Sequence, residues 1–280
     1  MTDTITGTPG RRIPTTHKEN VLSIGGQLIK SQGKTLHYNV LGEIAMIGED
    51  AGQFSVEGQG DLNFRLFNDT VRLEANAYIK NLNPTFYYRH FHSKHYWWDN
   101  NDLSKIMRTR LEGKLSLNRW GTQLRAGVEN IKNYTYLANA SIPVKDSEGN
   151  VTGFKNNAAV RQHSGNIQIF TAMLQQKLKV GIFHLDGEVA YQKSSEQDIL
   201  PLPELSAYGN LYMKFGLAKK VLQIEMGADV RYFSKYYAPD YSPVIGQFYN
   251  QNPDDKIEIG AFPIVNVYAN LHLKRPASLL

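Results

Sequence analysis

The sequence has no cysteine and no long run of apolar residues. With no cysteine among its 280 residues, the protein can have no disulfide, no thiolate metal site and no cysteine nucleophile. Its uninterrupted apolar stretches are only a few residues long, whereas a transmembrane helix needs about 20 mostly apolar residues in a row. Membrane-spanning helices are therefore excluded. A membrane location is not excluded, because a transmembrane β-strand needs only about 9–11 residues with every second one apolar.

The chain also lacks a concentrated basic segment and an export signal. It holds 31 Lys and Arg against 26 Asp and Glu, and the resulting net charge of +5 is scattered along the chain. A nucleic-acid-binding protein typically shows a basic stripe or a known motif, so no nucleic-acid partner is expected. The start, MTDTITGTPGRR, contains no apolar segment of the secretory type, so an exported protein would be expected to have its signal upstream of this sequence.

A strict period of two is the main feature that the sequence does have. Residues 54–66 alternate for thirteen positions between apolar or small residues and polar ones. The same alternation runs through residues 71–80 and 221–232, where one face is apolar and the other charged. Alternation with period two is typical of β-strands, and thirteen residues exceed the 5–6 of an ordinary strand.

Repetition of this pattern predicts an all-β fold. No segment of similar length shows helical spacing with caps, so we expect an antiparallel, up-and-down transmembrane β-barrel joined by hairpins. The chain would form one partial barrel domain over residues 1–280, with a leading segment (1–19), barrel strands (20–275) and a tail (276–280). The eleven predicted strands are residues 21–30, 36–47, 54–66, 71–80, 110–117, 122–131, 159–177, 183–191, 205–215, 221–232 and 265–274.

The predicted connections alternate between short and long. Every second connection of an up-and-down barrel lies at the same rim, so one rim would carry tight turns and the other large loops, as in bacterial outer-membrane barrels. Aromatic residues gather next to the long connections, as expected for a belt at the depth of the lipid headgroups. The short connections are residues 31–34, 67–70, 118–121, 178–180 and 218–220, residues 48–52 are short or medium, and the long ones are 83–103, 141–158, 194–204 and 236–258.

A soluble all-β ligand-binding protein is the main structural alternative, because a sandwich or a lipocalin-like barrel also alternates along its strands. Such folds seldom sustain a dozen alternating residues in strand after strand. The density of charges on the polar face also favours a water-filled lumen.

In a pore, the charged residues of the polar face set which solutes pass. Their signs are mixed, and for most of them a structural role in cross-strand pairing is the simpler interpretation. The predicted pore-lining residues are Glu57, Asp61, Arg65, Arg72, Glu74, Lys80, Arg110, Glu112, Lys114, Asp186, Glu188, Glu225, Asp229 and Arg231.

A group of histidines and aspartates in the first long connection has the composition of a Zn²⁺ site. His90, His92 and His95 lie close in sequence to Asp99 and Asp102. Tyr and Trp crowd the same stretch, so an interfacial aromatic belt is the better account, and we expect neither a metal nor another cofactor.

A barrel-embedded hydrolase is a second functional alternative. His163-Ser164 and His184 with Asp186 supply suitable residue types, and the test is whether they meet at one rim. His184 and Asp186 occupy consecutive polar positions of one strand, and no nucleophile elbow accompanies them. We therefore expect no enzymatic activity.

Three segments resemble a known family, the β-barrel porins of Bacteroidetes outer membranes. They are RRIPTTHKEN at 11–20, YYAPDYSPVIGQFYNQN at 236–252 and IGAFPIVNVYANLHLKR at 259–275, and the similarity extends over most of residues 11–275. The resemblance implies a bacterial outer-membrane location and passage of small polar solutes or ions, with no catalytic residues to transfer. The implied partners are outer-membrane lipid, the permeating solutes and the barrel-assembly machinery. A homo-oligomer is compatible with this class.

Two departures from that family's pattern lead us to expect a fragment of a larger barrel. The chain does not end on an aromatic residue, and an odd number of strands cannot close the usual even-numbered antiparallel barrel. An unclosed sheet would leave the hydrogen-bonding groups of its edges in lipid.

Overall fold

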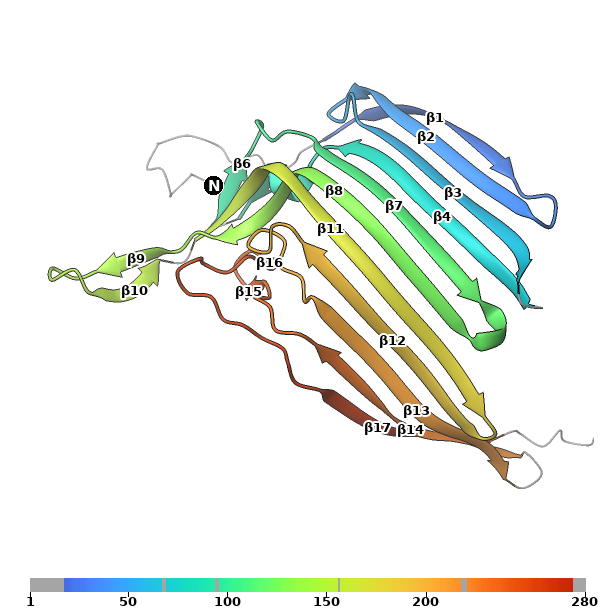
Figure 1. The fold of residues 1–280 in the computed structure, drawn as a ribbon. Coiled ribbons are helices and arrows are strands. Elements are labelled where there is room, and N and C mark those ends of the chain that lie inside the picture. The colour runs from blue at the N-terminus through green and yellow to red at the C-terminus, as the bar shows by residue number, and fades with distance from the viewer. Residues whose placement is uncertain (1–17, 67–68, 94–95, 156, 218–220, 274–280) are drawn as a thin grey trace, which may run out of the picture.

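The computed structural model describes residues 18–66, 69–93, 96–155, 157–217 and 221–273. They form one eleven-stranded sheet in which each strand pairs antiparallel with the next in the chain, and β1 and β17 lie at its two open edges (Figure 1). The strands are β1 (Val21–Lys30), β2 (Leu36–Gly48), β3 (Phe54–Leu66), β4 (Asp69–Leu82), β7 (Ile106–Leu117), β8 (Thr122–Asn139), β11 (Ala158–Val180), β12 (Phe183–Ser194), β13 (Leu205–Leu217), β14 (Leu222–Phe233) and β17 (Ile264–Leu273).

All eleven predicted strands are confirmed, as is the all-β antiparallel fold. Differences lie at strand ends: β8 continues to Asn139 because it stays paired with β11, and the turn expected at residues 178–180 follows at 181–182. Residues 67–68 and 218–220, parts of two predicted turns, lie outside the described residues, as do most of the leading segment and the tail.

The long connections contain small elements that the alternation did not predict. They are too short to show a period: the helix α1 (Phe86–Arg89) and three two-stranded hairpins. Among the described residues no helix is long and apolar enough to cross a membrane. The hairpins pair β5 (His90–His92) with β6 (Trp97–Asp99), β9 (Ile142–Lys145) with β10 (Val151–Lys155), and β15 (Asp240–Ser242) with β16 (Gln247–Tyr249); a 3₁₀ turn, η1 (Asn118–Trp120), lies between β7 and β8.

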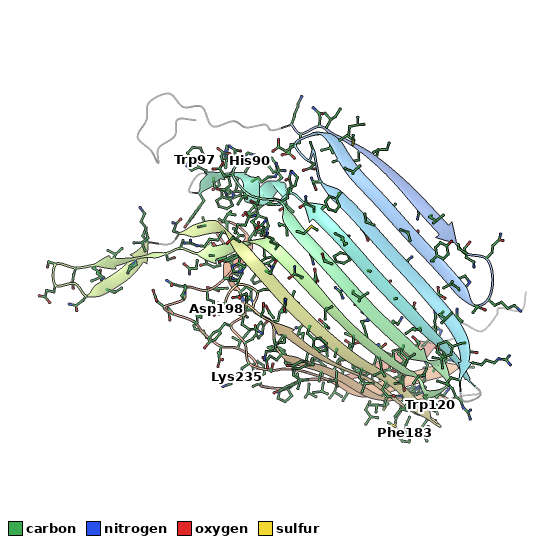
Figure 2. All side chains as sticks on the ribbon, turned by 45° about the horizontal axis from the view of Figure 1, so that its top comes forward. His90, Trp97, Trp120, Phe183, Asp198 and Lys235 are labelled. Atoms are coloured by element: carbon green, nitrogen blue, oxygen red, sulfur yellow. The ribbon has the colours of Figure 1, made fainter. Side chains whose placement is uncertain are left out.

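The two ends of the sheet differ in the size of their connections. His90, Trp97, Asp198 and Lys235 mark the end with the long loops, and Trp120 and Phe183 mark the opposite end with tight turns (Figure 2). The predicted asymmetry between the two rims is therefore present in the structure.

Most large side chains on the apolar face of the sheet are exposed, and the polar face carries buried residues near the long loops. Residues opposite each other in an antiparallel pair share a face, so Leu111 and Val128, which are opposite and 59% and 53% exposed, belong to the apolar one. Ile131 and Ile167, opposite each other on the polar face near the long loops, are 3% and 0% exposed. This distribution is the reverse of a water-soluble sheet packed on its apolar side.

Candidate functional site: a charged sheet face beneath interlocked loops

The fourteen predicted residues share one face of the sheet. Glu57, Tyr78, Arg110 and Glu129 stand opposite one another in turn on β3, β4, β7 and β8. The register then continues through β11 to Gln175, opposite Glu188 on β12, and on to β14. By this register and the period of two, the face carries Glu57, Asp61, Arg65, Arg72, Glu74, Lys80, Arg110, Glu112, Lys114, Asp186, Glu188, Glu225, Asp229 and Arg231.

Ion pairs join the charges on β3 and β4. Lys80 Nζ lies 2.6 Å from Glu57 Oε1. Arg72 lies between two acids, with Nη2 3.5 Å from Asp61 and 3.3 Å from Glu74. These contacts agree with the structural role expected for most of these residues.

The network continues across β7 and β8. Arg110 pairs with Glu112 on its own strand and lies 3.7 Å from Glu129. Glu129 also accepts hydrogen bonds from Arg108, at 2.6–2.8 Å, and from the Tyr78 hydroxyl at 2.8 Å. Arg108 and Glu129 are not among the predicted pore-lining residues, because Arg108 precedes the predicted strand and Glu129 lies in a less regular one.

Pairing is sparser on the C-terminal strands. Lys214 Nζ lies 3.0 Å from Glu225, and Arg231 Nε lies 3.9 Å from Asp229. Over the described part of the chain, no ion pair involves Arg65, Asp186 or Glu188, so these predicted residues have no partner of opposite charge there.

Two long loops meet at the end of β8 and β11. Leu137, Ala158 and Ile245 form a small buried core there. The Tyr87 hydroxyl donates to the Ile245 carbonyl at 2.8 Å, so the loop after β4 is tied to the loop after β14. The aromatic residues of this stretch that pack against that core, and are partly buried by it, are Tyr87, Tyr88, Phe91, Tyr96 and Trp98.

The loop after β14 reaches across the sheet to β8. The Asn250 backbone N–H donates to the Leu137 carbonyl, and the Asn139 N–H donates to the Asn250 carbonyl, both at 2.8 Å. The Asn250 amide donates to the Ile199 carbonyl at 2.7 Å, which adds the loop between β12 and β13. Three long loops therefore interlock at one rim.

Arg89 ties the loop after β4 to the start of the sheet. Its buried guanidinium donates to the Pro84 carbonyl at 2.9 Å, to Glu19 at 2.8 Å and to Glu49 at 3.1 Å. Burial alone would lower the pKa of Arg89, but the hydrogen bond and charge of Glu19 outweigh it and raise that pKa above its ordinary value.

The histidines of the same loop surround a carboxylate. His90 Nδ1 and His92 Nε2 lie 2.9 and 3.0 Å from the same oxygen of Asp99. Burial raises the pKa of Asp99, but these hydrogen bonds outweigh it and hold the pKa below its ordinary value. His95 lies outside the described residues, and within them no group of three or more ligand side chains, with Asp102 or any other, is arranged for a metal.

The residues of the hydrolase alternative lie at opposite ends of the sheet. His163 is on β11 near the long loops, whereas His184 stands opposite Lys179 near the tight turns. Sixteen residues of extended strand separate the two levels, roughly 50 Å. His163 and Ser164 therefore do not meet His184 at one rim.

Comparison with known families gives one match over nearly the whole chain. The model of a family described as "Putative porin" matches residues 2–277. A search of curated proteins found no match.

Proposed function

Because the chain belongs to the putative porin family, we propose that it forms part of the wall of an outer-membrane channel for passive diffusion of small polar solutes or ions. The wall has two sides in this proposal. Lipid contacts the apolar face, and water and solutes contact the charged face. Pore width and the charges of the fourteen residues named above set the selectivity, and no cofactor or catalytic step is involved.

The observation that carries the proposal is the reversed burial of the sheet. Leu111, Val128 and Leu211 on the apolar face are all more than half exposed, an arrangement that is unfavourable in water over so large a surface. In a bilayer the same residues lie in hydrocarbon, and the ion-paired face lies toward a wet lumen. The interlocked long loops would then lie at the outer rim, since the external loops are the longer ones in such barrels.

Partners follow from the same proposal. Outer-membrane lipid would surround the apolar face, and the barrel-assembly machinery would insert the chain. A homo-oligomer would use part of the same apolar face.

The test is planar-bilayer conductance of the chain after refolding in detergent. We expect stepwise currents. A chain that stays folded and monomeric without detergent and gives no current would overturn the proposal in favour of a soluble β-protein.

Charge variants connect any current to the proposed wall. Asp229→Asn and Glu225→Gln on β14 remove negative charge from the polar face, so the reversal potential in a KCl gradient should shift toward anion selectivity. Glu204→Gln removes the same charge from an exposed loop residue and should not shift it. Equal reversal potentials in all three variants would show that the polar face does not line the conducting path.

A further inference from the structure

A small cavity lies on the polar face of the central strands. Its volume is ≈ 170 Å³, enough for a solute of a few heavy atoms. All its lining residues belong to the polar face of β7, β8, β11 and β12, so the cavity opens on the proposed lumen. These residues are Lys114, Gln123, Arg125, Met173, Gln175 and Glu188.

Two charges of opposite sign line this cavity with weak partners. Within the described residues, the only ion-pair contact of Arg125 is to Glu112 at 3.8 Å, and Glu112 has a closer partner in Arg110. Among the side chains that the structure describes, Glu188 accepts only a long hydrogen bond, 3.5 Å, from the Gln175 amide. Elsewhere on the face, Lys80 and Glu57 approach to 2.6 Å, so close pairing is achieved where the geometry allows it.

The register separates these two charges across the cavity. Arg125 stands opposite Met173, and Glu188 stands opposite Gln175, so β11 lies between the strands that carry the two charges. Two strand spacings amount to about 10 Å between the strand axes. Long side chains reaching inward from both sides leave room for a small molecule between a guanidinium and a carboxylate.

We propose that this cavity is a subsite for small zwitterions of the amino-acid type. The solute carboxylate would accept hydrogen bonds from Arg125, and the solute ammonium would donate to Glu188. The amides of Gln123 and Gln175 offer further hydrogen bonds, and Met173 contacts the alkyl group. The inference rests on the proposed channel function, because it takes the polar face to be wet and open to solutes.

Lys114 strengthens the orientation of the bound solute. Lys114 stands directly opposite Arg125, and like charges in that position repel. Its ammonium is paired with Glu74 at 2.8 Å, so Arg125 is the cation with bonding capacity to spare. A simple anion would meet repulsion from Glu188, and a simple cation would meet repulsion from Arg125 and Lys114, so only a solute with both charges satisfies both ends.

The test uses four probes of matched size: L-alanine, lactate, alaninamide and lactamide. They are a zwitterion, an anion, a cation and a neutral molecule. Saturation-transfer NMR on the full chain in detergent micelles measures their binding without requiring flux. We expect L-alanine to bind at least tenfold more tightly than lactamide, because charge-assisted hydrogen bonds form at both ends.

Single-charge variants separate the two ends of the subsite. Arg125→Gln should weaken the binding of L-alanine about tenfold, and this variant should bind alaninamide more tightly than L-alanine. Glu188→Gln should weaken the binding of L-alanine by a similar factor, and this variant should bind lactate more tightly than L-alanine. Lys193→Gln and Glu204→Gln are the matched controls, because they remove the same charges from an exposed ion pair outside the cavity. Both controls should bind L-alanine as the unmodified chain does.

The outcomes for the subsite and for the channel are separable. Equal binding of all four probes would overturn the subsite. So would control variants that weaken the binding of L-alanine as much as Arg125→Gln and Glu188→Gln do. Conductance in planar bilayers without preference for L-alanine in binding would support the channel and refute the subsite. L-Alanine binding that depends on Arg125 and Glu188, in a chain that gives no current, would support the subsite and refute the channel.

Discussion

At the scale of single residues, burial decides which of the many ion pairs matter. Arg89 is buried and bonds to two acids and a carbonyl, whereas Lys193 and Glu204 form a pair 3.7 Å apart that is 60% and 51% exposed. Removing one partner of a buried pair leaves an uncompensated charge, while an exposed pair contributes little. The two sites therefore predict very different costs of substitution.

Arg89→Met should destabilise the loop after β4 by about 1–3 kcal/mol, because the carbonyl of the buried Pro84 loses its hydrogen-bond donor and the partly exposed Glu19 and Glu49 lose their shared cation. Limited proteolysis should then cut within residues 83–103 much faster than in the unmodified chain. Lys193→Met is the control, with a cost below about 1 kcal/mol. Equal cleavage of the two variants would contradict the anchoring role of Arg89.

The lowered pKa of Asp99 leads us to expect that the β5–β6 hairpin loses stability in acid. Burial raises the pKa of Asp99, but the hydrogen bonds with His90 and His92 outweigh this and lower it, so its stabilising contribution is complete above the ordinary carboxyl pKa of about 3.9. That contribution is lost as the pH falls through the lowered value. Protease cleavage of the β5–β6 hairpin should rise in that acidic range, and Asp99→Asn should remove this part of the pH dependence. An unchanged profile in the variant would assign the effect to other groups.

At the scale of elements, long strands could be predicted and short ones could not. The thirteen-residue alternation of β3 specifies both its length and its inward face, because a slip of one residue would move every side chain to the other face. Hairpins such as β5–β6 have three residues per strand, so their pairing depends on contacts with distant loops. For the same reason, the polar face could be predicted from alternation, whereas the meeting of Arg125 and Glu188 around one cavity could not.

The backbones of β13 and β14 approach so closely at Gly227 that we expect this position not to tolerate a larger residue. A Cβ at Gly227 would lie 2.5 Å from the Leu211 carbonyl oxygen, so Gly227→Ala must shift backbone and should cost about 1–3 kcal/mol. At Gly113, in β7, a Cβ would meet open space, and Gly113→Ala should change stability by less than about 1 kcal/mol. Urea titrations in lipid vesicles measure the unfolding midpoints of the two variants. Equal midpoints would contradict the close approach at Gly227.

At the scale of the whole molecule, the sheet is built inside out relative to a soluble protein. The ion pairs of its N-terminal strands and the buried pair Ile131 and Ile167 lie on one face, and most of its leucines and valines lie exposed on the other. The eleven strands lie side by side in a single layer (Figure 1). Within the described residues, no second layer of the sheet therefore packs against that apolar face. What covers the face must therefore come from outside the sheet, and hydrocarbon suits it along its whole length.

A charge placed on the apolar face tests this conclusion most directly. Leu111 lies at the middle of β7 and is 59% exposed, so Leu111→Arg in water would change stability by no more than about 0.5 kcal/mol. In a bilayer the same change should cost about 2–4 kcal/mol, because the arginine would lie near the midplane. Asn130→Arg, on the same face but nearer the long loops and already polar, should cost no more than about 1 kcal/mol. Guanidinium titrations in lipid vesicles measure both changes, and equal costs would mean that depth in a bilayer does not govern this face.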